Sequence, residues 1–120
     1  MWNKPNAEQL ACIPRLYTTE HTPLQDKLIH LHFFIGGCDW YICEIDETHE
    51  YMWGFVVLNQ DFQNAEWGYV SLAELVSIRV GFVEVDCDLY WKVRSAMEVA
   101  NIRKAHPHWK RYDQQPAAAL

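Results

Sequence analysis

The 120-residue chain lacks a long apolar run. No window approaches the roughly 20 consecutive apolar residues that a membrane-spanning helix needs. The opening residues, Met-Trp-Asn-Lys-Pro, have no apolar stretch of signal-peptide type. We therefore expect a protein that does not enter a membrane and works in the cytoplasm. Residues 117–120, Ala-Ala-Ala-Leu, are expected to be a vector-encoded linker, which leaves 1–116 as a single domain.

Paired cysteines are also missing. The four cysteines, Cys12, Cys38, Cys43 and Cys87, form no C-x-x-C pair. Scattered cysteines in a chain without a signal peptide are usually reduced and packed, so we expect neither a disulfide nor a zinc site. Cys38 and Cys43 flank an expected hairpin and are the pair that could approach each other.

The motifs of common enzymes are absent as well. The chain has no nucleophile elbow and no glycine-rich phosphate loop, and it holds five glycines in all. Nucleophilic catalysis therefore has no support; we expect no cofactor and favour a protein that is not an enzyme. Gly54 and Gly68 fall inside expected strands, where glycine marks a bulge or a close backbone contact.

What the chain does contain is apolar and aromatic surface, and an uneven charge. Half of the residues are hydrophobic, and six Trp, six Tyr and five Phe supply ample material for one core. The net charge is −6. Residues 1–91 hold four basic and fourteen acidic residues, a net of −10, whereas residues 92–120 hold six and two, a net of +4. We expect the basic C-terminal segment to fold back onto the acidic body rather than to mark a partner surface.

The pattern of apolar residues predicts an α+β fold, with a mostly antiparallel sheet of four or five strands in a meander and two or three short helices. Strands are expected at 28–35, 40–47, 51–58 and 66–70, with an extended segment at 82–93. A short helix is expected at 6–13, and capping boxes beginning at Ser71 and Ser95 predict two more helices, the second to about residue 104.

Strict alternation within these strands assigns side chains to faces. It places Ile29 on the same face as Leu31, and it places Glu44 on the same face as Trp40 and Ile42.

Four segments between Pro14 and about Val99 resemble a family of small bacterial and phage proteins, the domain of unknown function numbered 2958. The segments are 14–20 with 23–27, 33–46, 67–79 and 84–91. The most specific is the run Gly-Tyr-Val-Ser-Leu-Ala-Glu-Leu at 68–75. The resemblance implies a protein of plasmids, phages or integrative elements, some relatives of which lie beside or are fused to antirestriction-type domains. It implies no catalytic residue.

Two groups of acidic residues are candidate binding surfaces. They are Glu84, Asp86 and Asp88 on one expected strand, and Glu44, Asp46, Glu47 and Glu50 near a hairpin tip. Carboxylates in a row repel one another and need water or a cation. The first group could hold a divalent metal or imitate a row of phosphates, but a solvated face that guards a sheet edge is the favoured interpretation.

His30 and His32 are spaced to share one face of a strand, and Glu44 or Asp46 could add a third metal ligand. Such a set could bind zinc or iron, but the H-x-H spacing alone is a weak signal. We favour a polar strand face and predict no metal.

The C-terminal arm, about residues 105–116, mixes basic and aromatic side chains. Its candidate binding residues are His108, Trp109, Lys110, Arg111 and Tyr112. This mixture suits stacking on bases with contacts to phosphates, but the acidic body would repel nucleic acid. We expect Trp109 and Tyr112 to pack on the domain or on a second subunit.

Together these features predict a non-enzymatic protein-binding module of a mobile element or phage, with an unidentified protein partner and counter-defence as its specific form. A homodimer is an option, and nucleic acid is a disfavoured partner. Two alternatives remain open: a small metal-dependent enzyme that uses His30, His32 and nearby carboxylates, and a nucleic-acid-associated protein that uses the basic arm.

Overall fold

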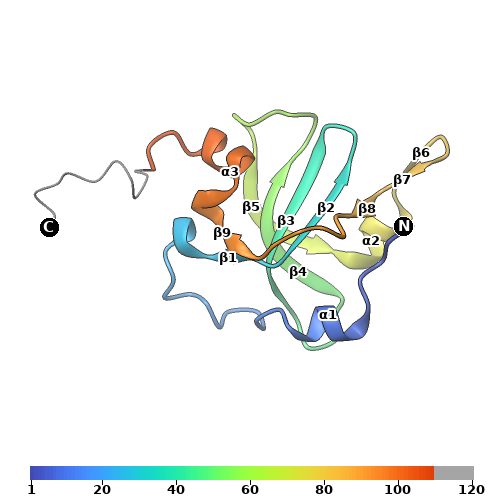
Figure 1. Cartoon of the computed structure of the whole chain (residues 1–120), viewed down its shortest axis with the longest axis horizontal. Coiled ribbons are helices and arrows are strands. Elements are labelled where there is room, and N and C mark those ends of the chain that lie inside the picture. Colours follow the sequence, from blue (N-terminus) through green and yellow to red (C-terminus); the bar gives the residue numbers. More distant parts are fainter. Residues whose placement is uncertain (110–120) are drawn as a thin grey trace, which may run out of the picture.

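The centre of the fold is a five-stranded antiparallel sheet with the strand order β5–β4–β3–β2–β8 (Figure 1). A computed structural model describes residues 1–109 of the chain. The strands are β2 (Leu31–Ile35), β3 (Cys38–Ile45), β4 (Tyr51–Val57), β5 (Glu66–Ser71) and β8 (Asp86–Cys87). Strands β2, β3 and β4 follow one another through short turns, and a longer loop at 58–65 leads to β5, so the predicted meander and the α+β class are confirmed.

Short helices and two small sheets surround this centre. The helices are α1 (Ala7–Ala11), α2 (Leu72–Ser77) and α3 (Ala100–Ala105), with single 3-10 turns η1 (Leu24–Asp26) and η2 (Ala96–Glu98). One small sheet pairs β1 (Leu28–Ile29) with β9 (Arg94–Ser95), and the other is a hairpin of β6 (Arg79–Val80) and β7 (Val83–Glu84). In residues 1–109 no helix is long and apolar enough to cross a membrane.

Local capping explains where the first two helices begin. Asn6 and Gln9 form a reciprocal capping box at α1, and the Ser71 side chain accepts a hydrogen bond from the backbone N–H of Glu74 at α2. The guanidinium of Arg15 donates to the carbonyls of Leu10 and nearby residues, which satisfies the end of α1.

The prediction of one helix from Ser95 to about residue 104 is wrong. The Ser95 hydroxyl donates to the side chain of Glu98 instead of capping the backbone, and a 3-10 turn forms there. Val99 then adopts an extended conformation, with φ −90° and ψ 116°, and buries its side chain. The α-helix starts only after it, because an extended residue ends one helical segment and precedes the next.

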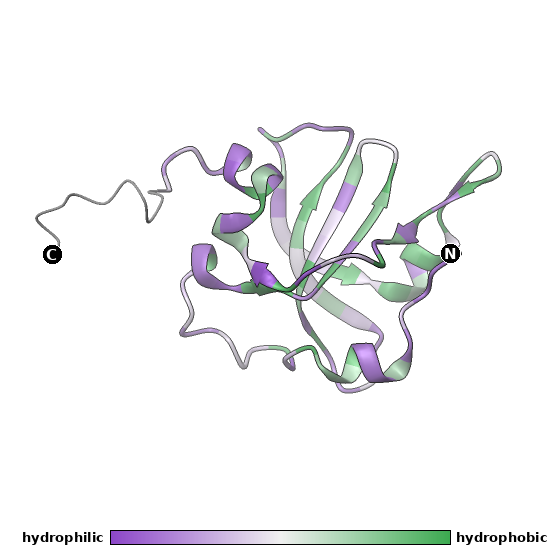
Figure 2. Ribbon diagram, in the orientation of Figure 1, coloured by the Kyte–Doolittle hydropathy of each residue, from purple (hydrophilic) through white to green (hydrophobic). Residues whose placement is uncertain are grey.

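Both faces of the sheet are covered, so the protein has two apolar clusters (Figures 1 and 2). The first cluster lies between the sheet and helices α1 and α2, and includes Phe33, Ile42 and Met52. The second lies between the sheet and the η2–α3 segment, and includes Phe55 and Ile102. Strands β3 and β4 contribute side chains to both clusters.

The predicted strand 28–35 is interrupted at His30. The backbone N–H of His30 donates to Ile42, but His30 belongs to neither β1 nor β2. As a result Ile29 packs in the second cluster, whereas Leu31 lies in the first. The assignment of Ile29 and Leu31 to one face is therefore wrong, since it required an unbroken strand.

A β-bulge in β3 changes the face of the sheet on which Glu44 lies. The pairing of β3 with β4 shifts register between Ile42 and Glu44, so that Glu44 lies opposite Trp53. A bulge adds one residue and turns the following side chains over. Ile45 consequently joins Ile42 in the first cluster, and Glu44 leaves the face on which strict alternation placed it.

Candidate functional site

Glu44 is a buried carboxylate at the bulge, with 5% of the residue exposed. Its Oε1 accepts a hydrogen bond from the backbone N–H of Tyr17 at 2.9 Å, and its Oε2 accepts one from the backbone N–H of Thr19 at 3.1 Å. The Thr19 hydroxyl also donates to Oε2. Three donors from one loop therefore stabilise the buried charge, as a carboxylate out of water requires.

Lys27 completes this buried polar group. It is 7% exposed, and its Nζ donates to the carbonyl oxygen and to the hydroxyl oxygen of Thr19. Thr19 thus links Lys27 to Glu44, and the resulting chain Lys27–Thr19–Glu44 is called the buried polar chain below. Tyr17, which donates to Glu44, has a φ of 71°, a region that non-glycine residues seldom adopt. The loop is held in an uncommon conformation by the carboxylate that it covers.

Glu44 therefore does not belong to an exposed acidic patch. Of the other residues in that group, Asp46 organises the turn between β3 and β4 by accepting from Thr48 and from the backbone N–H groups of Glu50 and Tyr51. These hydrogen bonds lower the pKa of Asp46 below its ordinary value despite some desolvation. Glu47 and Glu50 are the two members that point to solvent.

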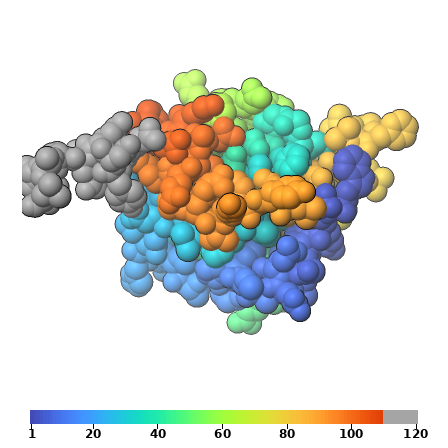
Figure 3. Space-filling view, viewed as in Figure 1, coloured from blue at the N-terminus to red at the C-terminus, as the bar shows by residue number. Residues whose placement is uncertain are grey.

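The row Glu84, Asp86 and Asp88 is partly covered by the N-terminal segment. The amino group of Met1 contacts Glu84, and Asn3 donates to Asp86 from its backbone N–H and its side-chain amide, both at 3.0 Å. Figure 3 shows the N-terminal segment, in blue, lying against this part of the chain. The contact with the amino group lowers the pKa of Glu84. Two of the three carboxylates thus hold the N-terminal segment against β7 and β8.

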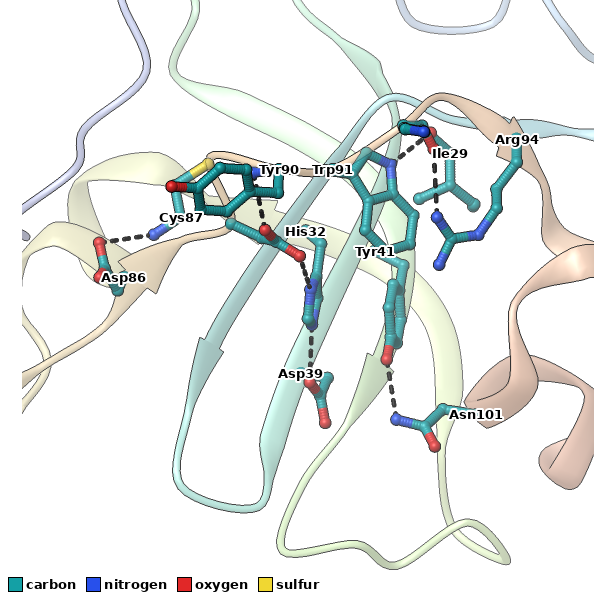
Figure 4. Close-up of polar contacts among 12 residues, drawn as sticks. Ile29, His32, Asp39, Tyr41, Asp86, Cys87, Tyr90, Trp91, Arg94 and Asn101 are labelled. Carbon is teal, nitrogen blue, oxygen red and sulfur yellow. Dashed lines mark hydrogen bonds and ion pairs between the residues drawn. The ribbon is translucent and has the colours of Figure 1, made fainter.

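The third carboxylate, Asp88, faces His32 (Figure 4). The imidazole lies between two acids: its Nε2 is 2.7 Å from Oδ1 of Asp39, and its Nδ1 is 3.6 Å from Oδ2 of Asp88. The ring also stacks on Tyr41, with 4.6 Å between centroids. Nε2 is hydrogen-bonded to Asp39, whereas Nδ1 is buried and makes no hydrogen bond among residues 1–109. The segment after β8 is held to the sheet by the backbone N–H of Asp88, which donates to the carbonyl oxygen of His32 at 3.0 Å.

Aromatic and cationic side chains lie next to His32 (Figure 4). The Trp91 indole N–H donates to the carbonyl oxygen of Ile29, and the guanidinium of Arg94 lies 3.9 Å from the Trp91 ring. The Tyr41 hydroxyl accepts from Asn101, and burial raises the pKa of Tyr41 to about 12. These contacts join α3 and residues 88–94 to the second apolar cluster. Their role is to stabilise the fold.

His30 and His32 do not share one site. His30 lines a cavity with Thr19, Lys27 and Cys43, and burial lowers the pKa of its imidazole. His32 faces Asp39 and Asp88 instead. Within residues 1–109 no three His, Cys, Asp or Glu side chains are grouped so that they could hold a metal ion. The two candidate third ligands, Glu44 and Asp46, instead accept hydrogen bonds from backbone N–H groups.

The described part of the C-terminal arm packs on the domain. Trp109 stacks on His106 with 3.9 Å between ring centroids, and His106 accepts a hydrogen bond from the Trp67 indole. Trp109 therefore extends the second cluster, as expected, while His108 is exposed. Lys110, Arg111 and Tyr112 lie outside the described residues.

The β6–β7 hairpin projects from the body and carries exposed apolar side chains (Figures 2 and 3). Its two-residue turn consists of Gly81, with a φ of 64°, and Phe82. Phe82 is 99% exposed, and the flanking Val80 is 67% exposed. The extended segment predicted at 82–93 is divided among this hairpin, β8 and the loop that leads to β9.

Residues 6–108 match the model of a family described as a protein of unknown function, DUF2958. The chain belongs to the DUF2958 family. Comparisons with curated proteins and with solved structures returned no match. The predicted resemblance is confirmed, and the match extends beyond the segments that suggested it.

In this DUF2958 member, sequence reasoning missed Tyr17, Lys27 and Phe82 as features of interest. A hydrophobic hairpin tip was readable from the run Val80-Gly-Phe-Val83, in which glycine separates apolar residues. No local signal marks Tyr17 or Lys27, because their importance depends on Glu44, which is distant in sequence and is turned inward by the bulge.

Proposed function

We propose that the protein acts by binding another protein, with the β6–β7 hairpin as the contact. One observation carries the proposal: Phe82 is 99% exposed at the tip of a projecting hairpin. A large aromatic side chain in water is unfavourable unless a partner covers it, and aromatic anchors supply much of the energy of protein interfaces. The acidic groups now contribute less, since Glu44 is buried and Asp86 is engaged by Asn3.

The geometry of the hairpin suits this role. Within residues 1–109, strands β6 and β7 pair with each other alone in a two-stranded sheet, and Arg79 lies 3.8 Å from Glu84 across it. A short isolated hairpin is marginally stable by itself. A partner strand or an apolar groove would stabilise it through main-chain hydrogen bonds and burial of Phe82.

The specific form that we propose is counter-defence: inhibition of a host nucleic-acid-targeting system by a protein of a mobile element or phage. Its support is the setting that the family resemblance implies for relatives, in plasmids, phages and integrative elements. A host protein is therefore the first partner to seek, and a second copy of this chain is the alternative.

Site-specific crosslinking tests the proposal. A photoreactive phenylalanine analogue placed at position 82 in living bacterial cells is expected to give a discrete covalent adduct, and the same analogue at Tyr51, 52% exposed, serves as the matched control. Phe82→Asp should abolish capture of that partner without changing the melting temperature. The proposal is wrong if positions 82 and 51 give the same adducts or if neither gives one.

A further inference from the structure

An open pocket of about 210 Å³ lies beside the buried polar chain. Its lining residues are Tyr17, Glu20, Lys27, Glu44, Trp53 and Tyr69. Pockets for drug-sized ligands usually measure roughly 300–1,000 Å³. The volume here therefore suits a smaller molecule, of roughly ten non-hydrogen atoms or fewer.

Aromatic rings form one side of the pocket. The Trp53 indole is stacked on Trp67, with 5.2 Å between centroids and 18° between planes, so its position is fixed. At the rim the Tyr69 hydroxyl donates to the Tyr17 hydroxyl at 2.9 Å. Ring faces attract cations such as alkylammonium groups. Glu20, which is exposed to solvent, adds a negative charge to the same lining.

Lys27 adds a positive charge to the pocket lining, and this charge attracts an anionic group of a ligand. Its Nζ has three N–H donors, and two of them are taken by Thr19. The Nζ also lies 5.4 Å from the centre of the Trp53 ring. The two hydrogen bonds to Thr19 leave the third N–H of this cation able to donate to a ligand. An anionic oxygen of a ligand would be the strongest acceptor for it.

Two backbone features independently place these groups around one space. The β3 bulge turns Glu44 toward Trp53, its partner on β4. Tyr17 holds a φ of 71° while its N–H donates to Glu44. Bulges and positive-φ residues are concentrated at binding and active sites, because they direct side chains at a cost in stability.

We propose that this pocket binds a small zwitterion, in which a carboxylate and an amino or methylated ammonium group are separated by one or two carbon atoms. The carboxylate accepts from Nζ of Lys27, and the ammonium group lies against Trp53 and the tyrosine rings, near Glu20. A ligand with only a positive charge would meet Lys27 uncompensated, and one with only a negative charge would meet Glu20 and Glu44. The site is separate from the hairpin, so it does not depend on the proposed protein partner.

Three probes of similar shape test the charge requirement on the full chain. Trimethylglycine carries both charges, choline carries the positive one, and 3,3-dimethylbutanoate carries the negative one. Titrations followed by NMR at the Trp53 indole N–H should show trimethylglycine binding at least about 10-fold more tightly than either other probe, since each lost ion contact is worth on the order of tenfold in a half-enclosed site.

Variants locate the site. Glu20→Gln should weaken trimethylglycine and choline about 3-fold, the range of an exposed ion pair, without weakening 3,3-dimethylbutanoate. Trp53→Leu, which lacks the indole signal and is followed instead at the backbone N–H of Tyr17 in the pocket lining, should weaken trimethylglycine about 5-fold by removing the cation–π contact. Lys27→Met should remove the preference for trimethylglycine over choline. Because Lys27 is buried, this variant could fail to fold, and the Glu20 and Trp53 variants then test whether the pocket binds the ligand. Glu47→Gln, on an exposed turn, is the matched control and should bind as wild type does.

Several results would overturn the proposal. One is the absence of any shift at Trp53 with millimolar trimethylglycine. Another is equal affinity for all three probes, which would show a merely apolar cavity. A third is choline binding as tightly as trimethylglycine, which would show a cation site. Binding that neither Glu20→Gln nor Trp53→Leu alters would place the ligand elsewhere.

Discussion

The α-carbon of Gly54 faces the backbone of Tyr41 so closely that a Cβ atom at position 54 would lie 1.9 Å from the Tyr41 carbonyl oxygen. The obstacle is main chain of the neighbouring strand, which cannot rotate away. Gly54→Ala should therefore cost more than about 3 kcal/mol in the free energy of unfolding, or prevent folding, because the sheet itself must move. Chemical denaturation followed by circular dichroism measures this.

Gly68 is the matched control, since it lies in the neighbouring strand β5 and a Cβ there would meet nothing within 4 Å. Gly68→Ala should change stability by less than about 1 kcal/mol, and in the stabilising direction. Comparable losses for the two variants would contradict the close approach at Gly54.

Glu44→Gln should destabilise the protein by about 2 to 4 kcal/mol. The carboxylate accepts from two backbone N–H groups and one hydroxyl, and an amide offers a single acceptor oxygen. At least one donor of Tyr17 or Thr19 is then left buried without a partner. Thermal and urea unfolding measure the loss, and Glu47→Gln, in the adjacent exposed turn, should lie within about 0.5 kcal/mol of wild type. Equal stability of the two variants would mean that the loop does not depend on Glu44.

The four cysteines should separate into two classes of reactivity. All four are free thiols; Cys12 is exposed and Cys38 half-buried, whereas Cys43 and Cys87 are buried. Burial raises the pKa of Cys43 to about 12 and that of Cys87 to about 11, so neither forms a reactive thiolate near pH 8. A thiol reagent at pH 8 should label Cys12 fastest and leave Cys43 and Cys87 unlabelled until denaturant is added, as mass spectrometry of peptides would show. Early labelling of Cys43 would contradict its burial.

His30 should make stability depend on pH on the acid side of neutrality. Burial lowers the pKa of the folded-state imidazole below its ordinary value of 6.5, so the unfolded chain binds the proton more readily. The contribution of neutral His30 is present above pH 6.5 and is lost as the pH falls below it. Melting temperatures between pH 7.5 and 5.5 should fall less for His30→Gln than for wild type. His21→Gln, at an exposed position, should follow the wild-type curve. Parallel curves for wild type and His30→Gln would refute the effect.

Most of the sheet was predictable because its signals are local. Alternating β-formers and short turns marked β2 to β5 within a few residues, and the Ser71–Glu74 capping box marked the start of α2. The break at His30 and the bulge before Glu44 were not predictable, because they arise from pairing with neighbouring strands rather than from the sequence of one strand. Each of them moved side chains to the opposite face.

The predicted site residues could be recognised from the sequence, whereas the residues that contact them could not. Charge and spacing marked Glu44, His32 and Asp86 as noteworthy, but their partners, such as Thr19, Asp39 and Asn3, are contributed by other segments of the fold. An acidic residue that caps a loop and one that faces solvent have the same sequence signature. Tertiary contacts alone distinguish them.

Strands β3 and β4 each present side chains to both apolar clusters, and this sharing has a consequence for how the sequence can vary. A substitution at Ile42 shifts a strand whose next residue, Cys43, belongs to the opposite cluster. Changes on the two faces are therefore coupled through the backbone and should not combine additively. Helices α1 and α2, by contrast, contact one face alone, so natural variation in this family should accumulate there more readily than in the two central strands.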